Sequence, residues 1–127
     1  MVKPNDLPLF IQGVMNHSMH FRIGLNPEQA YSFLENFGSY NEFKGKDVIA
    51  MIQEILPILK NCSPRLYVGR EYSMCIYFEV HSKNGLSSEQ VEQINNIAKQ
   101  ARADEFSCET THHEPLMCVQ QIRIWWD

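Results

Sequence analysis

The sequence lacks the long apolar run that a membrane-spanning helix needs, because no window approaches about 20 consecutive apolar residues. It also lacks any run of lysine or arginine, since its 11 basic residues are scattered among 15 acidic ones. Proteins that bind nucleic acid usually carry a basic patch and a high isoelectric point. The formal net charge of -4 therefore disfavours nucleic acid as a partner, and we expect no membrane partner either.

Several motifs that mark enzymes and cofactor sites are also missing. Neither GxGxxG nor GxxxxGK[ST] occurs, so the glycine-rich loops that cradle phosphates and dinucleotides are not present. No GxSxG motif marks a nucleophilic serine, and no spacing singles out a pair of catalytic carboxylates. We therefore expect no bound cofactor and favour a protein without catalytic activity.

Cysteine is scarce, and its spacing matches no metal or redox motif. The cysteines are Cys62, Cys75, Cys108 and Cys118. No CxxC pair occurs among them. Residues 1–19 hold only a short apolar run, interrupted by Pro8, which does not resemble the apolar core of a signal peptide. We therefore expect reduced thiols that pack as small apolar side chains, and a cytoplasmic location.

Histidine and cysteine side chains are the candidate metal ligands of this sequence. His17 and His20 have HxxH spacing. A second group near the end of the chain comprises Cys108, His112, His113 and Cys118. Structural zinc needs four converging ligands, usually in paired half-sites, and in a strand His112 and His113 would point to opposite faces. We therefore predict no metal site.

A nucleophilic Cys–His pair is disfavoured within any one predicted strand. Cys75 and His81 share a strand face but would lie about 20 Å apart along it, far beyond hydrogen-bond reach. A pair formed across strands, such as Cys75 with His113, stays open.

The first half of the chain predicts a strand followed by two helices. Polar and apolar residues alternate over residues 20–25, as in a strand with one buried face. Asn26 can cap a helix that begins at Pro27, and Gln29 can complete its capping box. Gly38 is a natural end for this helix.

Two segments of the first half are less regular. Apolar residues recur with helical spacing over residues 47–59, but Pro57 within this helix removes a hydrogen bond and costs about 3 kcal/mol. We expect a kink at Pro57 or an end near Leu56. Residues 1–19 permit two interpretations, a short packed helix or an extended lead-in segment.

The second half predicts a hairpin, a helix and another hairpin. Residues 65–81 alternate and include Gly69-Arg70, which suits a two-residue turn. A helix follows over residues 87–103, with Ser87 and Gln90 as its capping box. The last hairpin joins residues 106–112 to residues 117–126.

These elements together predict one α+β domain over residues 1–127, with an antiparallel sheet of about five strands and about three helices packed on one face. The opposite sheet face is the candidate binding site, because tyrosine, tryptophan and arginine are enriched at interface hot spots. The residues expected to bind a partner there are Arg22, Tyr77, Glu79, His81, His113, Arg123 and Trp125.

Two other interpretations of this face stay open. The same residues could form ordinary cross-strand pairs on a solvated surface. Alternatively, the second helix or the N-terminal segment could cover the face, and Trp125 would then belong to the core.

We therefore expect a non-catalytic binding protein that recognises a protein partner through this face and inhibits or regulates it. Its organisation resembles that of many small α+β proteins, including bacterial toxin-immunity proteins and phage-encoded inhibitors, in size, charge and missing motifs. The alternative function is a small enzyme or small-molecule-binding domain with a pocket lined by His, Cys or Glu. A third hypothesis is a homodimer through the last strand, residues 117–126, since an edge strand can pair with a second copy.

Overall fold

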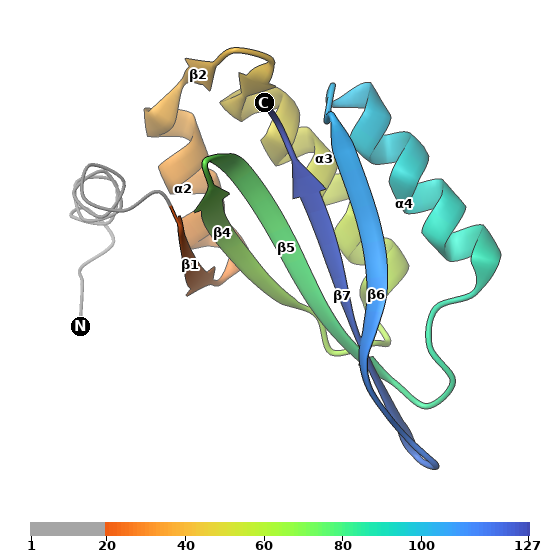
Figure 1. The fold of residues 1–127 in the computed structure, drawn as a ribbon. Helices are drawn as coiled ribbons and strands as arrows, with labels where there is room; N and C mark the ends of the chain where they lie inside the picture. Colours follow the sequence, from red (N-terminus) through yellow and green to blue (C-terminus); the bar gives the residue numbers. More distant parts are fainter. Residues whose placement is uncertain (1–19) are drawn as a thin grey trace.

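Within residues 20–127, which the computed structural model describes, a five-stranded antiparallel sheet carries three helices on one face (Figure 1). In their order across the sheet, the strands are β1 (His20–Leu25), β4 (Arg65–Glu71), β5 (Ser73–Ser82), β7 (Met117–Trp125) and β6 (Glu105–Glu114). The helices are α2 (Pro27–Phe37), α3 (Gly45–Leu59) and α4 (Ser88–Gln100). The predicted α+β fold class is confirmed, and the predicted N-terminal segment, residues 1–19, lies outside the described residues.

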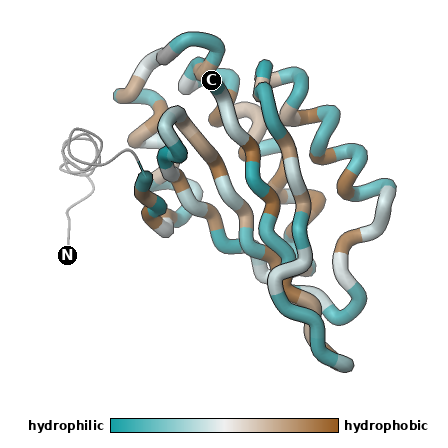
Figure 2. The backbone as a smooth tube through the Cα atoms, viewed as in Figure 1, coloured by the Kyte–Doolittle hydropathy of each residue, from teal (hydrophilic) through white to brown (hydrophobic). Residues whose placement is uncertain are grey.

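The core lies between the sheet and the helices, because every second side chain of each strand points to that side. Hydropathy alternates accordingly along the strands (Figure 2). Trp126, directly after β7, is fully buried in this layer and meets the ring of Phe43 edge-on, with centroids 5.0 Å apart. Its Nε1 donates a hydrogen bond to the carbonyl oxygen of Ala101 at 2.9 Å. The indole is therefore buried without an unsatisfied polar atom.

Both predicted capping boxes are confirmed. The side chain of Asn26 accepts from the amide of Gln29 at 2.8 Å, and Gln29 Oε1 accepts from the amide of Asn26 at 3.0 Å. Ser87 and Gln90 make the same two bonds at 3.1 and 2.9 Å. Each cap satisfies amides that the first turn leaves free and contributes about 1 kcal/mol.

The second helix begins two residues earlier than predicted and ends at the predicted residue, Leu59. α3 begins at Gly45 rather than at residue 47, and it continues through Pro57 to Leu59. The alternative end near Leu56 is therefore wrong. Leu59 is fully buried, and this burial holds the residues after Pro57 in the last turn despite the hydrogen bond that proline cannot donate.

A short hairpin that the sequence did not predict joins α2 to α3. Its strands are β2 (Ser39–Tyr40) and β3 (Phe43–Lys44). The amide of Gly45 donates to the carbonyl oxygen of Gly38 at 2.7 Å, so the two ends of the hairpin lie against each other. A Cβ at Gly45 would lie 2.1 Å from the carbonyl oxygen of Leu34, so this approach of α3 to α2 requires glycine.

The turn of the first predicted hairpin lies at Tyr72, and the expected turn at Gly69-Arg70 is wrong. Glu71 pairs with Ser73, and Tyr72 between them has a φ of 63°. Gly69 and Arg70 are both paired residues of β4. β4 and β5 are therefore longer than the sequence predicts. Gly69 lies within β4, where its missing side chain leaves space for neighbouring residues.

The need for space at Gly69 comes from two neighbours. A Cβ on Gly69 would lie 2.5 Å from the backbone oxygen of Phe21 on β1 and 2.7 Å from the ring of Tyr77 on β5. Both distances are far inside van der Waals contact, so β1 and the tyrosine ring can approach β4 only where no side chain stands.

A β-bulge in β6 changes which residues face the helices in the last hairpin. The register shifts between Thr110 and His112, which leaves Thr111 as an extra residue. His113 then lies opposite Cys118, which shares the helix-covered face with the core residues of β7. The expected placement of His113 on the opposite face is therefore wrong, because one inserted residue reverses the alternation.

The last strand is an inner strand of the sheet. β5 pairs with one edge of β7, and β6 pairs with the other edge. A homodimer through residues 117–126, the third hypothesis, would therefore find no free edge on this strand. In the described part of the sheet, the edge strands are β1 and β6.

Gly69→Ala is expected to lower the free energy of unfolding by about 1–3 kcal/mol, because the new methyl group must displace backbone or a packed ring. Gly24→Ala is the matched control, since its Cβ would approach only the side chain of Tyr67, at 3.3 Å. Chemical denaturation measures both variants. Equal stability of the two would show that Gly69 is not crowded.

Candidate functional site

The outer face, by which we mean the sheet face opposite α2, α3 and α4, is built from alternate residues of all five strands. No helix of residues 20–127 lies over it, so the interpretation that the second helix covers it is wrong (Figure 1). Its principal side chains are Arg22 on β1, Tyr67 and Glu71 on β4, Cys75, Tyr77, Glu79 and His81 on β5, Gln121, Arg123 and Trp125 on β7, and Glu105 on β6.

The carboxylate of Glu71 is the centre of one group of contacts on the outer face. Its Oε2 accepts a hydrogen bond from the hydroxyl of Tyr77 at 2.5 Å and another from Nε of Arg123 at 2.7 Å. The thiol of Cys75 lies 3.5 Å from the same oxygen. Nε1 of Trp125 donates to the backbone oxygen of Glu71 at 2.9 Å. One residue of β4 therefore joins side chains from β5 and β7.

These contacts fix the charges of the group. Burial raises the pKa of Glu71, but hydrogen bonds from Arg123 and Tyr77 outweigh it, and the pKa lies below its ordinary value of 4.5. Burial lowers the pKa of Arg123, but hydrogen bonds to Glu71 and Glu105 outweigh that effect and raise it. Burial and the bond to Glu71 both raise the pKa of Tyr77. Near neutral pH the group therefore holds an anion, a cation and a neutral phenol.

Cys75 is unsuited to act as a nucleophile. Its side chain is fully buried, and burial raises the pKa of the thiol to about 12. The thiolate, which is the reactive form, is therefore scarcely populated near neutral pH. His113 lies on the opposite sheet face, so the cross-strand pair of Cys75 with His113 is not formed.

Arg22 is the centre of a second group, next to the first. Its guanidinium carbon lies 3.9 Å from the ring centroid of Tyr67 and 4.9 Å from that of Tyr77. Nη1 donates to Oε1 of Gln121 at 2.5 Å, and Nη2 lies 3.9 Å from a carboxylate oxygen of Glu79. A cation over aromatic rings gains about 0.5–2 kcal/mol, depending on its exposure. Tyr77 belongs to both groups and connects them.

The outer face brings together most of the residues that the sequence singled out. The predicted residues found there are Arg22, Tyr77, Glu79, His81, Arg123 and Trp125. Nε2 of His81 lies 3.0 Å from Glu79, which links this histidine to the Arg22 group. His113 is not part of the face, for the reason given above.

The sequence prediction missed Tyr67 and Glu71. The misplaced turn ended β4 too early, so Glu71 was assigned to the wrong arm of the hairpin. The signal was nevertheless present, because Leu66 and Val68 point to the core and the alternation assigns their neighbours to the outer face.

The outer face is only partly open to solvent. Tyr77 is 5% exposed, and the side chains of Arg123 and Arg22 are 21% and 32% exposed. The interpretation as cross-strand pairs is therefore correct in that these residues contact one another, and their exposed parts form an ordered polar and aromatic surface.

The candidate metal ligands do not converge. No group of three or more His, Cys, Asp or Glu side chains among residues 20–127 is arranged to hold a metal ion. His17 lies outside the described residues. None of the helices in this part of the chain is long and apolar enough to cross a bilayer.

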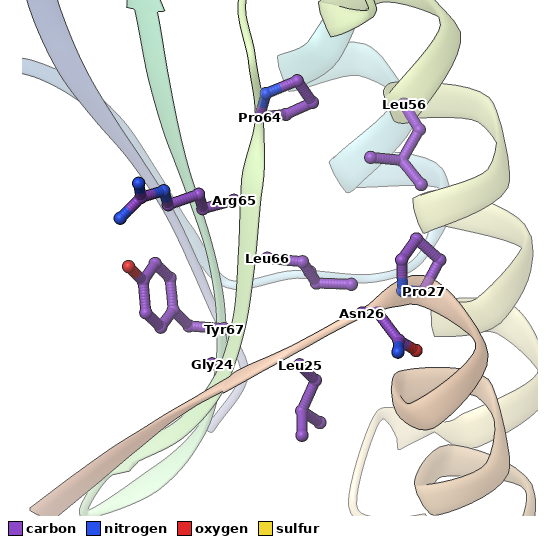
Figure 3. Close-up of a pocket in the computed structure, with 9 residues that line it drawn as sticks. All are labelled: Gly24, Leu25, Asn26, Pro27, Leu56, Pro64, Arg65, Leu66 and Tyr67. Atoms are coloured by element: carbon purple, nitrogen blue, oxygen red, sulfur yellow. The ribbon is translucent and has the colours of Figure 1, made fainter.

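A pocket of about 390 Å³ lies where β1 ends, between β4 and α3 (Figure 3). Its apolar lining comes from Leu25, Pro27, Leu56, Pro64 and Leu66. The side chains of Arg65 and Tyr67 lie on the other side of β4, and the side chain of Asn26 is engaged in its helix cap. This pocket has no His, Cys or Glu in its lining, so it differs from the catalytic pocket considered above.

Comparison of the chain with protein-family models, with curated proteins and with solved structures found no significant match. The function is therefore inferred from the geometry of the outer face and of the pocket.

Glu71→Ala is expected to lower the free energy of unfolding by about 1–3 kcal/mol, because it leaves the buried Tyr77 hydroxyl without its acceptor and removes one partner of Arg123. Glu105→Ala removes only the exposed partner of Arg123 and should cost at most about 1 kcal/mol. Urea denaturation compares the two variants. An equal loss would show that Glu71 contributes no more than a surface ion pair.

The stability that Glu71 contributes should depend on pH. Its folded-state pKa is lowered, so ionised Glu71 stabilises the fold above its ordinary value of 4.5, and the contribution is lost as pH falls through the folded-state pKa. The Tm advantage of the wild type over Glu71→Gln should therefore shrink as pH falls below 4.5. A constant Tm difference from neutral pH to pH 3 would contradict the assignment, and Glu105→Gln provides the baseline.

Proposed function

We propose that this chain is a non-catalytic binding protein that recognises another protein through the outer face and inhibits or regulates it. The observation that carries the proposal is the ordered arginine and aromatic surface around Arg22, Tyr77, Arg123 and Trp125, which no helix of the described residues covers. Side chains that are already held in place lose little conformational freedom when a partner docks.

The chemistry of the outer face favours a protein over a nucleic acid. The guanidinium groups of Arg22 and Arg123 both lie beside carboxylates, Arg22 near Glu79 and Arg123 near Glu71 and Glu105. A nucleic acid needs an excess of positive charge along a track for its phosphates, and the chain carries a net charge of -4. A protein surface that is itself mixed in charge is the complementary partner.

The proposed role is inhibition or regulation in the cytoplasm, similar to that of immunity proteins and inhibitors. A small sheet that presents contacting side chains on one face suits a protein that blocks or holds another. The four cysteines are free thiols, which is usual for proteins of reducing compartments.

The alternative, a small enzyme or small-molecule-binding domain, has less support. Its expected pocket combines an apolar cavity with a few polar groups that point into it. The pocket beside β1 is apolar, and the lowered pKa of Glu71 and the raised pKa of Cys75 belong to groups on the outer face instead.

The proposal is tested with a partner identified by cross-linking and affinity capture from cells that produce the chain, then purified. The double variant Arg22→Ala, His81→Ala should raise the Kd by about tenfold or more, because it removes partly exposed side chains of the outer face. Arg123 and Trp125 are unsuitable positions for this test, because their contacts with Glu71 also hold the sheet together.

The matched control is Glu92→Ala, Lys99→Ala on α4, where both side chains are exposed on the opposite side of the molecule. It should bind like the wild type. If the control weakens binding as much as the outer-face variant, or if the outer-face variant binds normally, the proposed site is wrong. The melting temperatures of all three proteins verify that they are folded.

A further inference from the structure

The tip of the last hairpin, residues 114–117, exposes two large apolar side chains. Leu116 is 78% exposed and Met117 is 45% exposed. The other large apolar residue exposed in the described chain, Tyr72 at 67%, rests against the ring of His20 with centroids 4.4 Å apart. The apolar atoms at the hairpin tip thus have little protein around them.

The hairpin tip extends beyond the rest of the sheet. β5 pairs with β7 only as far as Ser82, opposite Cys118, whereas the β6–β7 pairing continues to Glu114, opposite Met117. In Figure 1 this hairpin projects from one end of the molecule. The projecting part is held in shape by a bond from Thr111 Oγ1 to the backbone oxygen of Val119 at 3.2 Å. The tip is therefore a hydrogen-bonded projection of the sheet and not an irregular loop.

The same chain contains a pocket that is apolar, as the hairpin tip is. The pocket at the end of β1 has a volume of about 390 Å³ and a mainly apolar lining, and the side chains of Arg65 and Tyr67 point away from it (Figure 3). Pockets of this volume hold one small ligand or a few side-chain groups. Leucine and methionine have the size and the apolar character that this pocket can accept.

We propose that two copies of this chain associate by inserting the hairpin tip of each into the apolar pocket of the other. This surface is separate from the outer face, so the proposal goes beyond the function proposed above. The occupant of the pocket is Leu116, with Met117 beside it, from the second copy.

The positions of tip and pocket permit a closed, two-fold arrangement. Arg65, at the pocket, pairs with Glu79 on β5, and Glu79 pairs with Gln121 on β7, so the pocket lies at the end of the sheet from which the hairpin projects. Neighbouring strands are about 4.8 Å apart, which separates β4 from β6 by about 14 Å across the sheet. Two copies related by a two-fold axis at this end can therefore place each tip in the pocket of the other copy. Such a symmetric interface closes as a dimer.

The interface is small. Two tips in two pockets belong to the class of weak interfaces that bury less than about 1,200 Å², so association is expected in the micromolar to millimolar range. Sedimentation velocity of the full chain, from about 10 μM to about 1 mM, should show a monomer that converts to a dimer. A monomer at every concentration, or an open series of larger species, would overturn the proposal.

Substitutions at the tip and the pocket then locate the contact. Leu116→Asp should raise the dimer Kd by about tenfold or more, and Leu56→Glu in the pocket should do the same. Tyr72→Asp is the matched control, because it removes another exposed apolar side chain and should leave the dimer Kd unchanged. Dimerisation that survives both Leu116→Asp and Leu56→Glu would overturn the proposal.

A further measurement distinguishes the contact from loss of folding. A mixture of Leu116→Asp with Leu56→Glu should form mixed dimers more readily than either variant forms its own, because one intact tip meets one intact pocket. Failure of the mixture to form such dimers would show that the dimer forms elsewhere.

Discussion

The contact between Glu71 and Arg123 is the interaction on which the outer side of the sheet depends. It joins the last residue of β4 to Arg123 on β7 across β5, and the Tyr77 hydroxyl donates to the same carboxylate oxygen. An ion pair at this degree of burial is stable only when its remaining polar atoms are also satisfied, and Glu105 fulfils that condition for the guanidinium. The aromatic rings of Tyr77 and Trp125 are ordered by this arrangement, so the surface proposed to bind a partner follows from it.

The sequence predicted the parts of the fold that depend on local chemistry. The caps at Asn26 and Ser87 and the strand alternation are confirmed, because each is decided by neighbouring residues or by hydrophobic period. The misplaced features were decided by distant residues. Gly69 resembled a turn residue but provides space for Phe21 and Tyr77, which come from other strands.

The same distinction applies to the candidate site. Alternation alone assigned Arg22, Tyr77 and Arg123 to one surface, and that assignment is correct. Their mutual contacts were not predictable, because they depend on strand order and register across the sheet. The error at His113 has the same origin, since one extra residue in β6 has no signature in composition or period.

The β-bulge at Thr111 also affects how this protein behaves when it is crowded. β6 is the longer of the two edge strands in the described sheet, and a long regular edge is a template on which further chains can add as strands. The irregular register near Thr111 and the carboxylates of Glu105 and Glu109 make such addition unfavourable along this strand. A protein with this edge can be concentrated in a cell with little tendency to form fibrils, even though the neighbouring hairpin tip carries exposed leucine and methionine.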